Sequence, residues 1–242
     1  MESHLPAMDL HLPPSLPPEF PTPPAEPENR RSRVPKLALV VALVVGTAFV
    51  AVSWPVIMNQ RKAADRTFAI GSLKQMNLAL IDFDQDYGRF PDASTITDVG
   101  SATKTTMLLG DRTSNELFRQ LVAAGNKSEK IFWAPSPGHR RKPNDVLGTD
   151  ALAKGECIHS YVAGLSTKDS PRAIVAMASM IPGTTRFDPV PYDNRAVVLR
   201  IDGSAKPESL GKDGHINIHG KDPLDPSMPC WNGKAPDIKW PE

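Results

Sequence analysis

Apolar positions form two successive patterns in one stretch of the chain, residues 37–91. The first 22 residues, LALVVALVVGTAFVAVSWPVIM (37–58), contain no charged side chain. A helix of that length spans about 33 Å, which is enough to cross the hydrocarbon core of a bilayer. The pattern therefore predicts a transmembrane helix, with anchor residues Leu37, Leu43, Phe49, Trp54, Pro55 and Met58.

The second pattern follows the apolar run without an intervening Gly/Pro loop. Its apolar residues recur at spacings of four and three, which is the period of one face of an α-helix. We therefore expect the same helix to continue into a soluble domain, where Gly88 supplies a cap and Pro91 a stop. The predicted packing stripe consists of Ala69, Leu73, Met76, Leu80, Phe83 and Tyr87.

A cleaved secretory signal is the alternative to a permanent anchor, because Ala51-Val52-Ser53 has the small-x-small form of a cleavage site. The long leader and the apolar residues that continue to Met58 favour the anchor. Charge leaves the orientation open, since each side of the run has four basic residues: Arg30, Arg31, Arg33 and Lys36 before it, and Arg61, Lys62, Arg66 and Lys74 after it. The simplest topology keeps the short N-terminal tail in the cytoplasm.

Residues 1–36 contain ten of the 25 prolines and few large apolar side chains. Such a segment buries too little surface to offset the entropy of ordering. We expect a disordered, partly polyproline tail.

The region after Pro91 predicts one more helix and a set of strands. Residues 92–111 are polar and are expected to form a loop with a short element at 106–109. Thr113 and Glu116 fit a capping box for a helix that ends at Gly125. Strands are expected at 159–164, 173–180 and 196–201, the last pairing with 204–208 through the turn Asp202-Gly203. The segment HINIH (215–219) is expected to add a strand, before irregular chain at 222–242.

Three short segments together resemble the N-terminal region of type IV pilin-like proteins, in particular the pseudopilins of type II secretion. They are the basic and alanine stretch RKAA (61–64) after the proline of the apolar run, LKQMNLAL (73–80) and YGRFPD (87–92). The resemblance implies an α+β fold in which a long transmembrane-plus-soluble helix packs on a small antiparallel β-sheet. It divides the chain into a cytoplasmic tail (1–36), a transmembrane helix (37–58) and an extracytoplasmic pilin-like domain (59–242).

The same resemblance implies a function. Such a protein is a non-catalytic structural component of a secretion or pilus-type assembly, anchored by a single pass in a bacterial inner membrane. Its expected partners are the membrane and other pseudopilins or secretion-system components.

The start of the helix departs from the family pattern. A prepilin-peptidase site has a glycine before the cut and a glutamate soon after it, and neither is present near Arg33-Val34 and Ala38. This departure favours an alternative function, an anchored extracytoplasmic binding or sensor domain that does not polymerise.

Composition and motifs add little chemistry. The formal net charge is +1, from 28 basic and 27 acidic side chains, so no nucleic-acid partner is expected. Cys157 and Cys230 either form a disulfide or remain free thiols, and the sequence leaves both alternatives open.

No enzyme motif is found, so no catalytic residue, cofactor or metal is predicted. The acidic segment at 82–88 lacks the glycine and glutamate positions of a calcium loop. Asp213, His215 and His219 alternate along the expected strand, and solvated side chains are the simpler interpretation than a metal site.

Overall fold

The structure is a computed structural model that describes residues 36–136 and 141–242, without the side chains of residues 36–39, 42, 48 and 52. The chain forms two units, Met1–Ala48 and Phe49–Glu242, and the described strands all belong to the second. The predicted disordered tail therefore lies outside the described residues, apart from Lys36.

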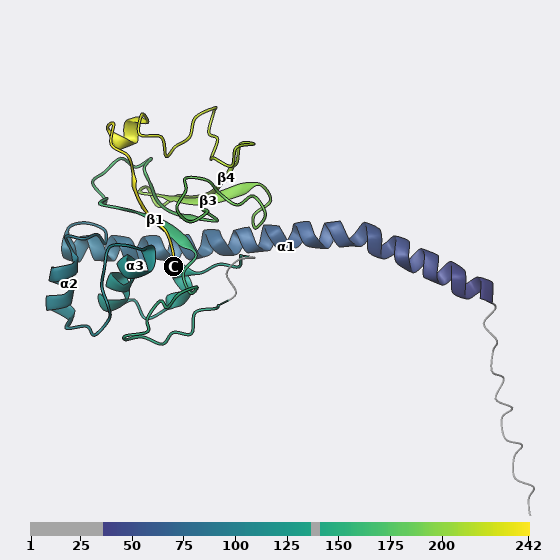
Figure 1. Cartoon of the computed structure of the whole chain (residues 1–242), viewed down its shortest axis with the longest axis horizontal. Helices are drawn as coiled ribbons and strands as arrows, with labels where there is room; N and C mark the ends of the chain where they lie inside the picture. The colour runs from purple at the N-terminus through teal and green to yellow at the C-terminus, as the bar shows by residue number, and fades with distance from the viewer. Residues whose placement is uncertain (1–35, 137–140) are drawn as a thin grey trace, which may run out of the picture. The chain divides into compact units, whose positions relative to one another are not determined.

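One long helix begins the described part of the chain. Helix α1 (Lys36–Tyr87) has 52 residues and continues through Pro55 without a break (Figure 1). It ends where Gly88 adopts a φ of +77°, and the Gly88 amide donates a 2.7 Å hydrogen bond to the Asp84 carbonyl. A positive φ costs glycine little, so this residue stops the helix cleanly. The predicted continuation of the apolar run into a second helical half is confirmed.

The sheet is small and antiparallel, as predicted, and the fold is α+β. Its order is β4-β3-β2-β1-β5, in the segments β1 (His159–Ala163), β2 (Ile174–Ala178), β3 (Arg195–Arg200), β4 (Ala205–Ser209) and β5 (Asp237–Lys239). All five residues of β2 are buried, and so are the central residues of β3. Because successive side chains point to opposite faces, both faces of these strands are covered.

The β3–β4 hairpin forms as predicted. Gly203 has a φ of +77° and donates to the Arg200 carbonyl at 2.9 Å, which closes the turn. Pro207 is accommodated because β4 is an edge strand, where a missing amide donor is tolerated.

Helix α3 (Ser114–Ala123) starts with the expected cap, in which Thr113 Oγ1 accepts from the Glu116 amide at 3.2 Å. The Glu116 carboxylate instead accepts from the Arg112 amide at 2.8 Å. Two short 3₁₀ helices follow, η1 (Glu129–Phe132) and η2 (Pro229–Trp231).

Three predictions about secondary structure are wrong. The segment 222–242, expected to be irregular, contains η2 (Pro229–Trp231) and strand β5 (Asp237–Lys239), which pairs with β1. The loop expected after Pro91 contains helix α2 (Ile96–Thr103), and no helix or strand occurs at 106–109. The segment 215–219 forms only two isolated bridges, Leu210 to Ile216 and Ile218 to Lys221, because tight turns flank it and His219 has a φ of +54°.

Candidate functional site

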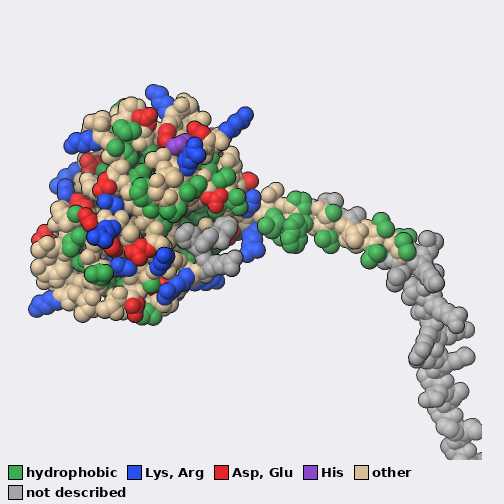
Figure 2. Space-filling view, viewed as in Figure 1, with side chains coloured by type: hydrophobic (Ala, Val, Ile, Leu, Met, Phe, Trp, Pro, Cys, Tyr) green, Lys and Arg blue, Asp and Glu red, His purple; other side chains and the backbone are tan. Residues whose placement is uncertain are grey.

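The predicted anchor residues lie on the N-terminal half of α1. Leu43, Phe49 and Trp54 are 69%, 72% and 63% exposed, and Met58 is 37% exposed. Figure 2 shows the apolar side chains that stand on the surface of this part of the helix. In the described part of the chain, one helix is long and apolar enough to cross a membrane, judged by length and composition alone. Pro55 lies within it, and the side chain of Leu37 is outside the described set.

The predicted packing stripe lies on the other half of α1. Five of its six residues are at most 2% exposed, namely Ala69, Leu73, Met76, Leu80 and Phe83. Tyr87 is partly buried and its ring lies 4.5 Å from the ring of Phe83, measured between centroids. At about 25 cal/mol per Å² of apolar surface, burial of this stripe is a main reason why the helix docks on the domain.

Polar contacts also join α1 to the domain along its length. Arg66 Nη1 donates to the Tyr192 carbonyl at 3.3 Å, and Ser72 Oγ lies 3.0 Å from Nε2 of His159 on β1. Further along, the Thr167 hydroxyl donates to the Asp84 carboxylate. Buried polar groups need such partners, so these pairs define the register of α1 against the sheet.

The YGRFPD segment is a junction between four elements. The Phe90 amide donates to the Leu165 carbonyl at 3.0 Å, and the Tyr161 hydroxyl on β1 donates to the Pro91 carbonyl at 3.0 Å. Gln120 on α3 donates through Nε2 to the Asp92 carbonyl at 3.0 Å. Burial raises the pKa of Tyr161 well above its usual range, so this hydroxyl stays a donor.

Asp92 organises the start of α2 within the same junction. Its Oδ1 accepts from the amide and hydroxyl of Ser94 at 2.7 and 2.6 Å, and its Oδ2 pairs with Arg89 at 3.0 Å. Thr95 in turn donates to Gln120 Oε1 at 2.6 Å. The motif that carries the family resemblance is therefore a structural joint that fixes where the chain goes after α1.

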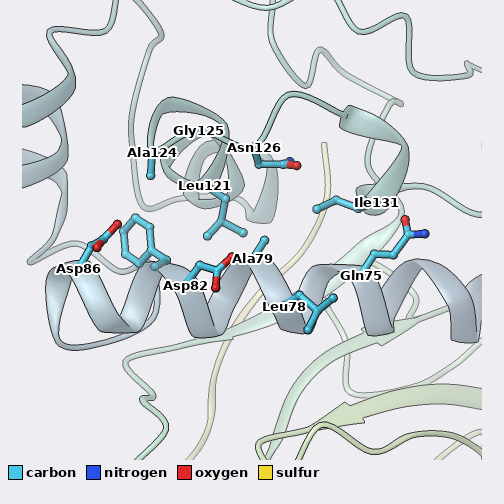
Figure 3. Close-up of a pocket in the computed structure, with 11 residues that line it drawn as sticks. Gln75, Leu78, Ala79, Asp82, Asp86, Leu121, Ala124, Gly125, Asn126 and Ile131 are labelled. Atoms are coloured by element: carbon cyan, nitrogen blue, oxygen red, sulfur yellow. The ribbon is translucent and has the colours of Figure 1, made fainter.

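A groove of about 460 Å³ runs between α1 and the end of α3 (Figure 3). Its lining mixes apolar side chains such as Phe83 and Leu121 with polar ones, and Leu78 at its edge is 63% exposed. The charged residues that line it are Asp82 and Asp86, both on α1. Apolar side chains beside two carboxylates suit a partner segment that carries both apolar and basic side chains.

The two cysteines are free thiols in the structure, so the disulfide alternative is not realised. Cys157 is fully buried, and its Sγ lies 3.8 Å from Ser114 Oγ and 3.6 Å from the His159 carbonyl. Burial raises its pKa to about 12. Cys230 belongs to η2 and is partly exposed, in a groove beside Arg200.

The three residues considered for a metal do not converge. His215 pairs through Nδ1 with Asp222 Oδ2 at 3.1 Å, while Asp213 accepts from the His215 amide. Over residues 36–136 and 141–242, no cluster of three or more His, Cys, Asp or Glu side chains is arranged to hold a metal ion.

Comparison with protein families, with curated proteins and with solved structures found no match for the chain. The geometry of α1 and of the domain it enters is therefore the basis for a functional interpretation. The groove was not predicted from the sequence. The pattern that could have indicated it is Leu78 and Asp82, which are four residues apart and therefore share a face of α1 outside the buried stripe.

Proposed function

We propose that the protein is a membrane-anchored, pilin- or pseudopilin-like structural component of a secretion or pilus-type assembly and acts without catalysis. The observation that carries this proposal is α1 itself. One continuous helix has an exposed apolar half and a half that is built into an antiparallel α+β domain. The first half would hold the protein in a bacterial inner membrane, with the domain on the extracytoplasmic side.

The groove beside α1 supports a role in assembly. It places exposed Leu78 and two carboxylates on the half of α1 that packs into the domain, where the domain of a neighbouring subunit in the same membrane would lie. The partner would present a segment with apolar and basic residues. The YGRFPD joint would keep the groove walls at a fixed spacing, because it ties the end of α1 to α3.

Site-specific cross-linking tests the proposal. A photo-reactive residue is placed at Leu78 in the groove, and a matched control at Lys168, which is exposed outside it. We expect cross-links from position 78 to membrane proteins that themselves carry a pilin-like N-terminal helix, and none from position 168. If neither position gives a cross-linked product and only the monomer is recovered, the result would contradict the proposal.

The N-terminus reports on processing. Intact mass of the protein from membranes distinguishes a start near Val34, a start at Trp54 and a retained Met1. The first outcome means pilin-type processing, the second means signal cleavage, and the third means a permanent anchor.

A second candidate function is an anchored binding or sensor domain that does not polymerise. A separate groove of about 970 Å³ favours it. Arg172, Arg200, Lys206 and Lys221 line that groove together with one carboxylate, Asp202, and this excess of cations suits an anionic ligand. A strictly monomeric membrane extract, combined with no cross-link at position 78, would favour this function over the first.

A further inference from the structure

A third pocket, of about 400 Å³, lies where α1 enters the domain. From α1 it is lined by Met58, Arg61, Lys62 and Asp65, and from the domain by Trp133, Pro135, Ser136, Lys142, Val190 and Pro191. Figure 2 shows Lys and Arg side chains where the helix meets the domain, as well as over the rest of the visible face. The pocket thus combines three cations and one carboxylate with apolar walls.

The cations of this pocket outnumber its one carboxylate, Asp65, which interacts electrostatically with Arg61. Within the described residues, none of Arg61, Lys62 and Lys142 forms an ion pair with a carboxylate. Arg61 and Lys142 are exposed, and Val190 beside them is 55% exposed. A surface with an excess of positive charge next to exposed apolar side chains suits a ligand that is anionic at one end and apolar at the other.

Helix geometry gives the level of the pocket relative to a membrane. If the apolar run ends at Met58, Arg61 and Lys62 lie about 4.5 and 6 Å beyond the hydrocarbon core, at about 1.5 Å per residue. The headgroup region is about 5 to 7.5 Å deep on each side. Both cations are therefore at the depth of the lipid phosphates, and Lys142 reaches the same pocket from the domain.

We propose that this pocket binds the phosphate headgroup of an anionic phospholipid, with Lys142 and Val190 as the domain's contribution. The site would fix the tilt and rotation of the domain above the bilayer. It rests on the membrane anchoring in the proposed function and is independent of polymerisation. Free inorganic phosphate has related chemistry, but it does not use the apolar wall.

The test uses the full chain in nanodiscs of phosphatidylcholine, with or without phosphatidylglycerol, and native mass spectrometry of the lipids retained after release. Recovery of the chain with the nanodiscs establishes anchoring first, so a failure of the anchor is seen separately. We expect phosphatidylglycerol to be retained selectively, and Lys142→Gln to reduce that retention about fivefold, which corresponds to about 1 kcal/mol per cation at a membrane surface.

Two variants serve as controls. Lys142→Arg keeps the charge and should keep the lipid. Lys168→Gln removes another exposed lysine and should change nothing. Lys168 follows Thr167, which contacts Asp84, about 39 Å along α1 from Met58. Equal retention of both lipids by the native chain, or an equal loss in both Gln variants, would overturn the proposal. Displacement of phosphatidylglycerol by inorganic phosphate would show that the site is a free-phosphate site instead.

Discussion

At the scale of single residues, the hydroxyl of Tyr161 makes one of the contacts that close the YGRFPD junction. It is fully buried, and the Pro91 carbonyl that it reaches is buried as well. A buried carbonyl that loses its donor keeps the full cost of its lost hydration.

We therefore expect Tyr161→Phe to lower the free energy of unfolding by about 1 to 2 kcal/mol. Tyr87→Phe is the matched control, because the Tyr87 hydroxyl has no hydrogen bond within the described residues. Its effect should stay within about 0.5 kcal/mol. Urea denaturation measures both, and equal losses would mean that the Tyr161 hydrogen bond adds no stability.

Gly203 has two constraints, its positive φ and its contact with α1. A Cβ atom at this position would lie 3.0 Å from Nδ2 of Asn77. We expect Gly203→Ala to cost about 1 to 2 kcal/mol, mostly through the left-handed backbone. Gly220→Ala shares the positive φ but meets no atom within 4 Å. Thermal melts measure the cost of Gly203→Ala in the native chain and in an Asn77→Ala background. If the two costs are equal, the added Cβ atom makes no significant contact with Asn77.

The cysteines should differ in reactivity. The buried Cys157 thiol, with its raised pKa, should resist iodoacetamide in the folded protein, while partly exposed Cys230 should react. Peptide mass mapping should find one adduct under native conditions and two after denaturation without reductant. Cys230→Ser should remove the native adduct. Protection of both residues after denaturation would reveal the disulfide that the structure lacks.

At the scale of elements, α1 places residues of the same type in two different environments. Leu73 is fully buried against the domain, whereas Leu78, little more than one turn later, is 63% exposed at the groove. Leu73→Ala should therefore cost about 2 to 5 kcal/mol. Leu78→Ala should cost less than about 0.5 kcal/mol and instead weaken the cross-link to a partner. Similar melting temperatures for the two variants would contradict this assignment of faces.

The long helix, the sheet hairpin and the α3 cap could be predicted because their signals are local. Apolar period, the Asp202-Gly203 turn and the Thr113 cap each depend on neighbours in sequence. The local signal for helix α2 is weaker. Asp92 Oδ1 accepts from the Ser94 amide near its start, but Thr95 makes no side-chain cap contact and Gly100 lies inside the helix. It is also held by buried Val99 and by the hydrogen bond from Thr95 Oγ1 to Gln120 Oε1, which are tertiary contacts.

The candidate surfaces were less predictable than the fold. A groove or a basic pocket requires residues from separate elements, such as Lys142 and Arg61, to meet. Sequence reasoning located Arg61 and Lys62 beside the apolar run but had no means of adding Lys142 and Val190 to them. The free state of Cys157 and Cys230 depends in the same way on where two distant segments lie.

At the scale of the whole molecule, the exposed apolar half of α1 should control where the protein resides. Phe49 is near the middle of the apolar run, where a lysine costs about 2.5 to 3.5 kcal/mol on insertion scales. We expect Phe49→Lys to shift the protein from the carbonate-resistant membrane fraction toward the soluble fraction. Leu108→Lys, at a 71% exposed site in the domain, should have no effect. Equal membrane retention of both variants would mean that the apolar run is not the anchor.

The position of β5 in the sheet has a consequence for the order of folding. Strand β1 pairs on one side with β2, which follows closely, and on the other with residues 237–239, more than 70 positions later. Such distant pairing is slow, because the intervening chain must be ordered first. In a chain that emerges N-terminus first, the helix and strands β1 to β4 would form while the edge of β1 that pairs with β5 is still unpaired. Folding of the sheet is therefore complete only when β5 pairs with β1, so this pairing sets the time at which the domain reaches its final structure.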